Sequence, residues 1–332
     1  MRRVFASTLV PASSRGGAAG ADGYGVTAHP SWRGVDWAAH LHRTRLGGTD
    51  VAYVDLGPAR STDEHPVVFV HGLSGQWQNW LENMPRMALE RRVIALDLPG
   101  FGVSGPAAGD VSISGYGQLV EQLCDHLGLG AVTLVGNSMG GFIAAETAIQ
   151  FPARVERLVL VSAAGISSVD EKAAPVLTLG RVGAAVMAAG VPYGRRIAAR
   201  PVARHLALGL VARHPSLLAP DLAYEGFMKG SATVGFNDAL RAVLGYDFRH
   251  RLPEIACPTL IVWGEQDAVI PVRDAQVFER LIPDSRKVVM RDTGHISMAE
   301  RPQAFNELLV DFVAESGSAE REERVPGESQ VA

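Results

Sequence analysis

The stretch Val132-Thr133-Leu134-Val135-Gly136-Asn137-Ser138-Met139-Gly140-Gly141 decides the fold of this chain. Its first four residues are apolar or β-branched, and they predict a buried strand. A helical pattern follows from Phe142 onward. Strand, tight turn and helix are the context in which a serine flanked by glycines exposes its hydroxyl at the edge of a sheet. We therefore expect Ser138 to be a nucleophile, with the first N–H groups of the helix pointing toward developing negative charge.

Glycine is expected at both ends of this turn for steric reasons. If Ser138 sits at the apex of a strained turn, side chains at Gly136 and Gly140 would collide with the neighbouring backbone. The alternative interpretation is an ordinary buried strand with a glycine-rich turn, because a short Gly-x-Ser-x-Gly pattern also arises by chance. The rest of the chain has to decide between the two.

The composition is that of an ordinary globular protein. The 332 residues are 47% hydrophobic and 20% charged, which allows a sizeable core in one α/β unit. The net charge of −4 gives no electrostatic case for nucleic acid. The two cysteines, Cys124 and Cys257, lie far apart without metal-ligand spacing, so we expect neither a disulfide framework nor a metal site.

Short apolar runs alternate with helical patterns along the body of the chain. We expect an opening hairpin from residues 36–45 and 51–56, around Gly47 and Gly48. Further strands are expected at 67–70, 93–96, 132–135, 158–161, 259–263 and 288–290, and helices at 76–89 and 116–127. Apolar strands that alternate with helices predict an α/β fold, a parallel sheet with helices on both faces.

The segments outside this alternation are assigned by composition. We interpret residues 1–30 as a poorly ordered leader whose apolar run is too short for a signal peptide, and we expect a cytoplasmic protein. The tail at 316–332 is rich in Glu, Arg, Ser and Gly and is expected to be disordered. Residues 31–165 and 252–315 form the expected core. Residues 166–251 are expected to form a helical lid, because structureless loops of that length are rare in compact domains.

The lid contains a stretch from Val176 to Gly190 that is apolar apart from Arg181. It is too short to span a membrane. We interpret it as a lid helix packed on the core, and the sharper alternative is the wall of a tunnel for a lipid chain. On that alternative, Val176 and Val186 are candidate substrate-binding residues.

Four arginines follow at near-helical spacing in the lid, at Arg195, Arg196, Arg200 and Arg204. We interpret them as a solvated face, with contact to an anionic membrane surface as the alternative. No stable membrane insertion is expected.

A serine hydroxyl needs an adjacent base, which a third group orients. Candidates for both follow strands after Ser138, in the order acid and then histidine. Asp267 ends the turn Trp263-Gly264-Glu265-Gln266-Asp267, and His295 ends the run Asp292-Thr293-Gly294-His295. We predict the catalytic triad Ser138, Asp267 and His295. Glu265 and Asp292 are the competing acids; Glu265 comes earlier in its turn, and Asp292 is close in sequence to His295.

An oxyanion hole needs two preorganised N–H donors. One is expected from Met139, directly after the nucleophile, and the other from the loop after strand 67–70, where Leu73 is our candidate. Gly72 in that loop is a candidate substrate-binding residue. We interpret His71 as a structural histidine that bonds loop carbonyls.

These motifs together resemble the α/β-hydrolase family. The resemblance spans roughly residues 36–314 and is carried by His71-Gly72, Asp97-Leu98-Pro99-Gly100-Phe101-Gly102, Gly136-Asn137-Ser138-Met139-Gly140-Gly141, Trp263-Gly264-Glu265-Gln266-Asp267 and Gly294-His295. It implies a mostly parallel, eight-stranded sheet, a helical cap after the sixth strand, and no cofactor.

Within the family, the serine motif and the run from Gly294 to Pro302 look most similar to monoacylglycerol-lipase-like and carboxylesterase members. The same serine motif occurs in the carbon–carbon bond hydrolases of aromatic ring degradation, which generally carry Trp directly after the catalytic His. This chain has Ile296 there. A serine at position 138 also argues against epoxide hydrolases and haloalkane dehalogenases, which use an Asp.

We therefore predict a serine hydrolase of carboxylic esters whose partner is a small-molecule ester with a hydrophobic acyl group. The first alternative is carbon–carbon or amide hydrolysis, or acyl transfer, on the same triad. The second is a ligand-binding receptor that keeps the triad. The sequence leaves the oligomeric state open.

Overall fold

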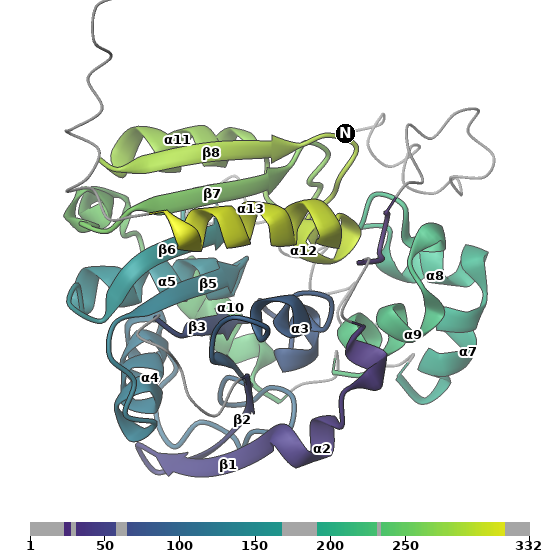
Figure 1. Cartoon of the computed structure of the whole chain (residues 1–332), viewed down its shortest axis with the longest axis horizontal. Helices are drawn as coiled ribbons and strands as arrows, with labels where there is room; N and C mark the ends of the chain where they lie inside the picture. Colours follow the sequence, from purple (N-terminus) through teal and green to yellow (C-terminus); the bar gives the residue numbers. More distant parts are fainter. Residues whose placement is uncertain (1–22, 28–30, 58–64, 168–190, 231–233, 316–332) are drawn as a thin grey trace, which may run out of the picture.

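An eight-stranded sheet runs through the centre of the molecule (Figure 1). The computed structural model describes residues 23–27, 31–57, 65–167, 191–230 and 234–315. The strands lie in the order β1-β2-β4-β3-β5-β6-β7-β8. Their bounds are β1 Leu41–Leu46, β2 Thr49–Leu56, β3 Val67–Val70, β4 Val93–Leu96, β5 Val132–Asn137, β6 Val155–Val161, β7 Thr259–Gly264 and β8 Ser285–Met290. Only β1–β2 and β2–β4 pair antiparallel, so the predicted, mostly parallel α/β sheet is confirmed.

Helices cover both faces of this sheet, as predicted. One face carries α4 Ile113–His126, α5 Met139–Gln150 and α11 Arg273–Leu281, and the other carries α3 Met84–Met87 and α13 Pro302–Ala314 (Figure 1). Successive strand residues alternate between the two cores because strand side chains have a period of two. In β3, Val68 and Val70 join the core under α4 and α5, whereas Val67 and Phe69 join the core under α13.

Two predicted elements differ in detail from the structure. The first half of the expected strand 36–45 forms a helical turn, α2 Trp37–His40, which follows the short helix η2 Trp32–Gly34. This turn lets the Trp37 indole donate a 2.9 Å hydrogen bond to the carbonyl of Trp32. The expected helix 76–89 is two short pieces, η3 Trp77–Trp80 and α3, because Pro85 lacks an N–H and favours a new helix start.

In the insertion after β6, the helices between residues 191 and 228 lie beyond the carboxyl ends of the parallel strands, whereas residues 236–254 pack against α4, α5 and α11 (Figure 1). Its described helices are η6 Val191–Tyr193, α7 Gly194–Ala199, α8 Pro201–Leu208, η7 Pro215–Leu217, α9 Pro220–Leu222, η8 Ala223–Met228, α10 Phe236–Leu244 and η9 Arg249–Glu254. The apolar stretch with Val176 and Val186 lies outside the described residues. None of the helices in the described ranges is long and apolar enough to cross a membrane.

The insertion is bonded to the core near the start of η3. Gln76 Nε2 donates to the carbonyl of Glu225 at 2.7 Å, and Asn79 Nδ2 donates to the carbonyl of Gly226 at 2.6 Å. Both acceptors lie in η8, which has π-helical geometry. The segment that follows the loop of Leu73 is therefore held by the insertion as well as by the sheet.

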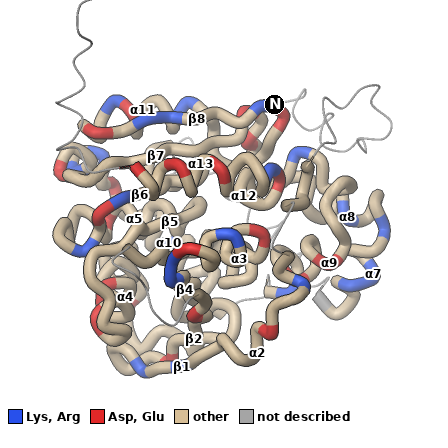
Figure 2. Tube along the Cα trace, in the orientation of Figure 1, with Lys and Arg blue, Asp and Glu red and all other residues tan. Residues whose placement is uncertain are grey.

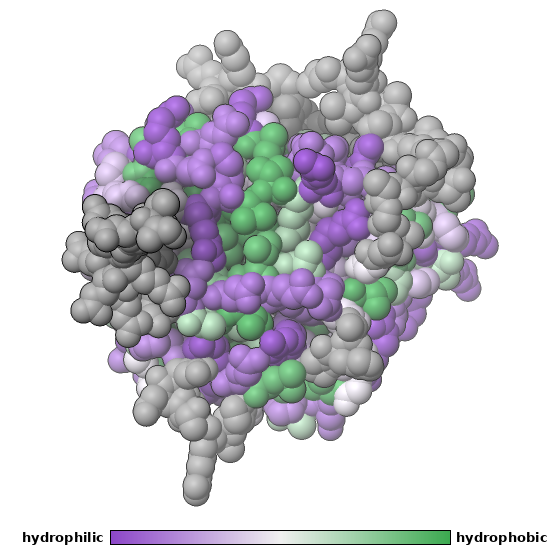
Figure 3. All heavy atoms as spheres, turned by 45° about the horizontal axis from the view of Figure 1, so that its top comes forward, coloured by the Kyte–Doolittle hydropathy of each residue, from purple (hydrophilic) through white to green (hydrophobic). Residues whose placement is uncertain are grey.

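Two expectations about segments outside the sheet, the leader and the solvated arginine face, differ from the structure in detail. Within the segment interpreted as a leader, Tyr24 is buried, so the packed part of the chain begins before residue 31. Arg204, expected on a solvated face, is also buried, whereas Arg195, Arg196 and Arg200 are exposed. Most of the surface seen in Figure 3 is hydrophilic, with apolar residues gathered in a band near its centre.

Candidate active site

Ser138 occupies the sharp turn between β5 and α5. Its backbone has φ 56° and ψ −119°, a conformation that non-glycine residues rarely adopt. The neighbouring glycines make the turn feasible: a Cβ on Gly136 would lie 2.1 Å from the carbonyl oxygen of Gly140, and one on Gly140 would lie 2.2 Å from that of Val70. The strained turn predicted from the glycine pattern is present.

The turn is tied to the next strand by its own backbone. Ser138 N–H donates to the carbonyl of Val161 at 2.9 Å, and the Ser138 carbonyl accepts from Ala164 N–H at 3.0 Å. Ser138 itself is half-buried. A hydroxyl in this position is accessible from the carboxyl edge of the sheet while its backbone is held on both sides.

Asp267 and His295 are in direct contact. Asp267 Oδ2 lies 2.8 Å from His295 Nδ1, and both side chains are buried. The other carboxylate oxygen of Asp267 accepts from the N–H groups of Val269 and Ile270 at 2.8 and 2.9 Å. One oxygen is thus fixed by the loop, which aims the other at the imidazole.

The two competing acids have other partners. Asp292 lies 2.8 Å from His214 Nε2 and 3.2 Å from Arg213 Nε. Glu265 accepts from the side chain of Gln266 at 2.7 Å. Of the three acids weighed from the sequence, Asp267 is the one that the structure brings to the ring of His295.

The loop after β3 packs directly against the serine. Gly75 N–H donates to the Gly72 carbonyl at 2.9 Å, which closes a turn in which Ser74 has φ 62°. A Cβ on Gly72 would lie 3.0 Å from the Ser138 Cβ. Leu73 lies inside this turn. Met139 is the first residue of α5, and the first N–H groups of a helix have no intrahelical acceptor.

His71 is a buried, neutral histidine that holds two loops together. Its Nε2 accepts a 3.0 Å hydrogen bond from Leu98 N–H, so Nδ1 carries the proton and donates to the Gly72 carbonyl at 2.7 Å. Burial lowers the pKa of His71 to about 4. The sequence-based interpretation anticipated the bond to a carbonyl but not the accepted N–H.

A comparison with protein families adds an independent observation. Residues 65–302, well over half of the chain, match the family described as alpha/beta hydrolase fold. The chain belongs to the α/β-hydrolase family.

Individual relatives of this hydrolase differ in their named activities. It is 32% identical over 278 residues to the dihydrolipoyllysine-residue acetyltransferase component of an acetoin cleaving system from Pseudomonas putida, covering 82% of this chain and 68% of that protein. It is 31% identical over 283 residues to a 2-hydroxy-6-oxo-2,4-heptadienoate hydrolase from Pseudomonas putida, covering 81% and 94%. The crystal structure of a bacterial membrane phospholipase A has a TM-score of 0.66 at 26% identity, covering 84% and 88%.

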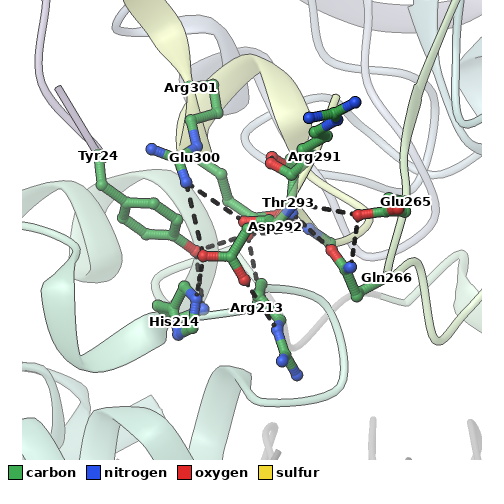
Figure 4. A network of polar contacts seen from close by, with 11 residues as sticks. Tyr24, Arg213, His214, Glu265, Gln266, Arg291, Asp292, Thr293, Glu300 and Arg301 are labelled. Atoms are coloured by element: carbon green, nitrogen blue, oxygen red, sulfur yellow. Dashed lines mark hydrogen bonds and ion pairs between the residues drawn. The ribbon is translucent and has the colours of Figure 1, made fainter. Parts of the chain in front are cut away.

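A buried carboxylate that was not predicted from the sequence, Glu300, contacts the loop of residues 291–295, called the histidine loop (Figure 4). Its oxygens accept from the N–H groups of Arg213 at 2.7 Å and Gly294 at 2.9 Å, and from the Tyr24 hydroxyl at 2.5 Å. Burial raises the pKa of Glu300, and these donors act in the opposite direction. A charged residue in the otherwise uncharged run Ile296-Ser297-Met298-Ala299-Glu300 was the available signal.

The insertion of the hydrolase also reaches the histidine. His295 N–H donates to the carbonyl of Val211 at 2.8 Å, just before the Arg213 N–H that binds Glu300. A Cβ on Gly264, at the end of β7, would lie 1.9 Å from the Gly294 carbonyl oxygen. Core strand, insertion and Glu300 therefore hold the backbone of His295 from three sides.

Among the described residues, no group of three His, Cys, Asp or Glu side chains could hold a metal ion.

Proposed function

We propose that this α/β-hydrolase cleaves carboxylic esters through an acyl-enzyme, with Ser138 as nucleophile, His295 as base and Asp267 as its orienting acid. The observation that carries the proposal is the 2.8 Å contact between Asp267 and His295 in a chain whose Ser138 occupies the strained turn at the sheet edge. Nucleophile, base and orienting acid are the parts that acyl transfer requires.

In the proposed reaction, Ser138 attacks the ester carbonyl while His295 takes its proton. Asp267 fixes the imidazole tautomer and stabilises the cation that forms. The N–H groups of Leu73 and Met139 bind the oxyanion. His295 then protonates the departing alcohol, and it later activates a water that hydrolyses the acyl-enzyme.

A hydrophobic acyl group is the proposed specificity. The apolar stretch of residues 176–190 belongs by sequence to the insertion, and the described helices between residues 191 and 228 of that insertion lie beyond the carboxyl ends of the strands (Figure 1). The similar solved structure named as a membrane phospholipase A supports an ester with an acyl chain. Burial of each CH₂ in an apolar pocket is worth about 0.8 kcal/mol, so kcat/KM should rise by up to about fourfold per added CH₂ until the pocket is full.

Carbon–carbon bond hydrolysis is the second candidate. The relative named 2-hydroxy-6-oxo-2,4-heptadienoate hydrolase, at 31% identity, favours it. Ile296 favours the ester instead, because it stands where ring-cleavage hydrolases generally carry Trp. The relative at 32% identity is named as an acetyltransferase component. Acyl transfer to an acceptor other than water is therefore a variant of the same proposed acyl-enzyme chemistry.

Labelling and turnover together test the proposal. A fluorophosphonate probe should label the wild-type protein and leave Ser138→Ala unlabelled. Turnover should then be compared on p-nitrophenyl esters of increasing chain length and on a ring-cleavage dienone. Higher kcat/KM on the longer esters than on the dienone supports the ester proposal. Preference for the dienone would move the assignment to carbon–carbon hydrolysis, and labelling without turnover of either would indicate a receptor.

A further inference from the structure

The helix α8 of the insertion exposes two apolar residues, Val202 and Leu206, while it buries two basic ones, Arg204 and His205. Val202 and Leu206, four residues apart in α8, are 59% and 61% exposed, and Leu210, just beyond the end of the helix, is 38% exposed. Such spacing places residues on one face of a helix. The buried residues of the helix are Arg204, His205 and Leu208, at 4%, 1% and 2% exposure. A surface helix normally buries its apolar face and exposes its charges.

The buried arginine fixes this orientation. Arg204 Nε donates to the carbonyl of Pro215 at 2.9 Å, Nη2 donates to that of Ser216 at 2.8 Å, and Nη1 donates to that of Ala198. Rotating α8 to bury Val202 and Leu206 would strip these bonds from a buried cation, which is strongly unfavourable. The outward apolar stripe is therefore a stable property of the fold.

Exposed arginines directly precede these apolar residues in the sequence. Arg196 and Arg200 are exposed and make no ion pair within the described part of the chain, and the Arg195 side chain is 75% exposed beside Glu225. Figure 2 shows basic residues along α7 and α8. Between residues 191 and 230 the sequence has six basic and two acidic residues, although the whole chain has a net charge of −4. The stripe is thus basic at its border in an acidic protein.

We propose that this surface, formed by Arg195, Arg196, Arg200, Val202, Leu206 and Leu210 and called the cap stripe, docks on the surface of an anionic lipid bilayer. An apolar stripe beside arginines is the pattern with which helices lie in a membrane interface. Each basic residue near an anionic surface is attracted to it, and the apolar side chains enter the headgroup boundary. A second copy of the chain fits less well, because a two-fold contact would bring like arginines together.

Docking in this orientation has a geometric consequence. The helices α7 and α8 lie beyond the carboxyl ends of the strands (Figure 1), and Ser138 directly follows the carboxyl end of β5. A bilayer against the cap stripe would therefore face the same end of the molecule as the candidate active site. The docking proposal does not depend on which bond the hydrolase cleaves.

Co-sedimentation with vesicles tests the cap stripe directly. The protein should carry Ser138→Ala, so that no vesicle lipid is hydrolysed. The vesicles are phosphatidylcholine alone, or phosphatidylcholine mixed with phosphatidylglycerol. We expect binding to the mixed vesicles that weakens as salt is added. Because this protein lacks the serine, a failure of the ester proposal would leave the binding result unchanged.

Two double variants separate the contributions. Val202→Ser with Leu206→Ser should lower partitioning at least about tenfold by removing apolar area. Arg196→Gln with Arg200→Gln should lower it about 20- to 30-fold, since each basic residue contributes roughly fivefold at an anionic surface. The matched controls are Leu89→Ser and Arg45→Gln. These two side chains are also exposed, but they belong to the α/β part of the chain and not to the insertion.

Each outcome bears on the proposal. Loss of binding in both double variants, with binding kept in both controls, supports it. Equal binding to neutral and mixed vesicles, or variants that bind like wild type, would overturn it. A concentration-dependent dimer in sedimentation velocity that Val202→Ser with Leu206→Ser abolishes would assign the cap stripe to self-association instead. Unchanged hydrolysis of a soluble short ester by the double variants, with Ser138 restored, would show that they fold.

Discussion

The Tyr24 hydroxyl donates a 2.5 Å hydrogen bond to Glu300 across 276 residues of sequence. The same hydroxyl accepts the N–H of His214 at 2.8 Å. Burial raises the pKa of Tyr24 well above its usual value, so the hydroxyl keeps its proton. This pair links the start of the packed chain, the insertion and the histidine loop in one buried network (Figure 4).

Glu300→Gln should lower kcat more than it changes KM. The new amide would present N–H donors to a site filled by the N–H groups of Arg213 and Gly294, and the histidine loop would shift. Displacements of about 1 Å at an active site can cost about 100-fold in rate, so we expect a 10- to 100-fold loss in kcat. Steady-state kinetics on a soluble ester measures the changes in kcat and in KM separately.

Two further variants accompany this measurement. Tyr24→Phe should lower the free energy of unfolding by about 1–3 kcal/mol, because it leaves the buried His214 N–H without its acceptor. Glu307→Gln, on the exposed side of α13, should stay within about 0.5 kcal/mol of wild type. If Glu300→Gln loses stability but retains wild-type kcat, Glu300 has no role in positioning His295.

Ser138→Ala should abolish hydrolysis and leave the fold nearly intact. The small side chain fits the turn, and a triad acts as a unit, so the rate should fall on the order of 10⁴- to 10⁶-fold. Activity and thermal unfolding measured on the same preparation check both parts. A folded variant that retains more than about a tenth of the wild-type rate would exclude Ser138 as the nucleophile.

Asp267→Asn should reduce kcat by roughly 10⁴-fold, because the amide favours the wrong tautomer of His295. Glu265→Gln is the matched control, since its carboxylate contacts Gln266 and not the imidazole. The pre-steady-state rate of fluorophosphonate labelling reports the same difference without a substrate. Greater damage from Glu265→Gln would show that the wrong acid was chosen.

Position in the sheet made the candidate triad predictable. Ser138, Asp267 and His295 each follow a short strand rich in apolar residues, and parallel strands bring their carboxyl ends to one edge. Glu300 was not predictable in this way, because its donors are two backbone N–H groups and a tyrosine from a distant segment. Arg204 was misassigned for the same reason. Its acceptors are backbone carbonyls, and backbone acceptors leave no mark in a sequence pattern.

Asp97 and His71 should make opposite contributions to the pH dependence of the free energy of unfolding, and these contributions should nearly cancel in the wild-type protein. Burial raises the pKa of Asp97 to about 6, so the folded state holds a proton that the unfolded carboxyl releases. That contribution lowers the free energy of unfolding as pH rises from about 4 to 6. His71, whose pKa burial lowers to about 4, is neutral when folded and protonated when unfolded. Its contribution raises the free energy of unfolding over the same range.

Asp97→Asn should expose the histidine contribution alone. Relative to wild type, its free energy of unfolding should increase with pH between about 4 and 6, by at most about 3 kcal/mol. Urea unfolding at a series of pH values measures the free energy of unfolding of each protein. Taking the difference between variant and wild type cancels the contributions of titratable groups that both proteins contain. Relative to wild type, the free energy of unfolding of His71→Asn should decrease with pH over the same range. Parallel curves for wild type and Asp97→Asn would mean that Asp97 titrates normally.

Gly264→Ala should inactivate the enzyme without touching the triad. The added Cβ would lie 1.9 Å from the Gly294 carbonyl oxygen, so the backbone before His295 must move. We expect a loss in kcat of about 100-fold or more. Gly109→Ala is the control, because a Cβ there meets nothing within 4 Å. Wild-type kcat in Gly264→Ala would show that the histidine loop tolerates displacement.

The order of residues along the chain also has a consequence for biosynthesis. The serine turn belongs to β5 and α5, but Asp267 and His295, the proposed acid and base, and Glu300 are translated only after the whole insertion. A ribosome-bound chain can fold the nucleophile turn long before a base exists to activate it. We expect nascent chains, and fragments that end before Glu300, to be inert toward esters and toward fluorophosphonate. Labelling in an expressing cell would then count finished molecules and ignore unfinished ones.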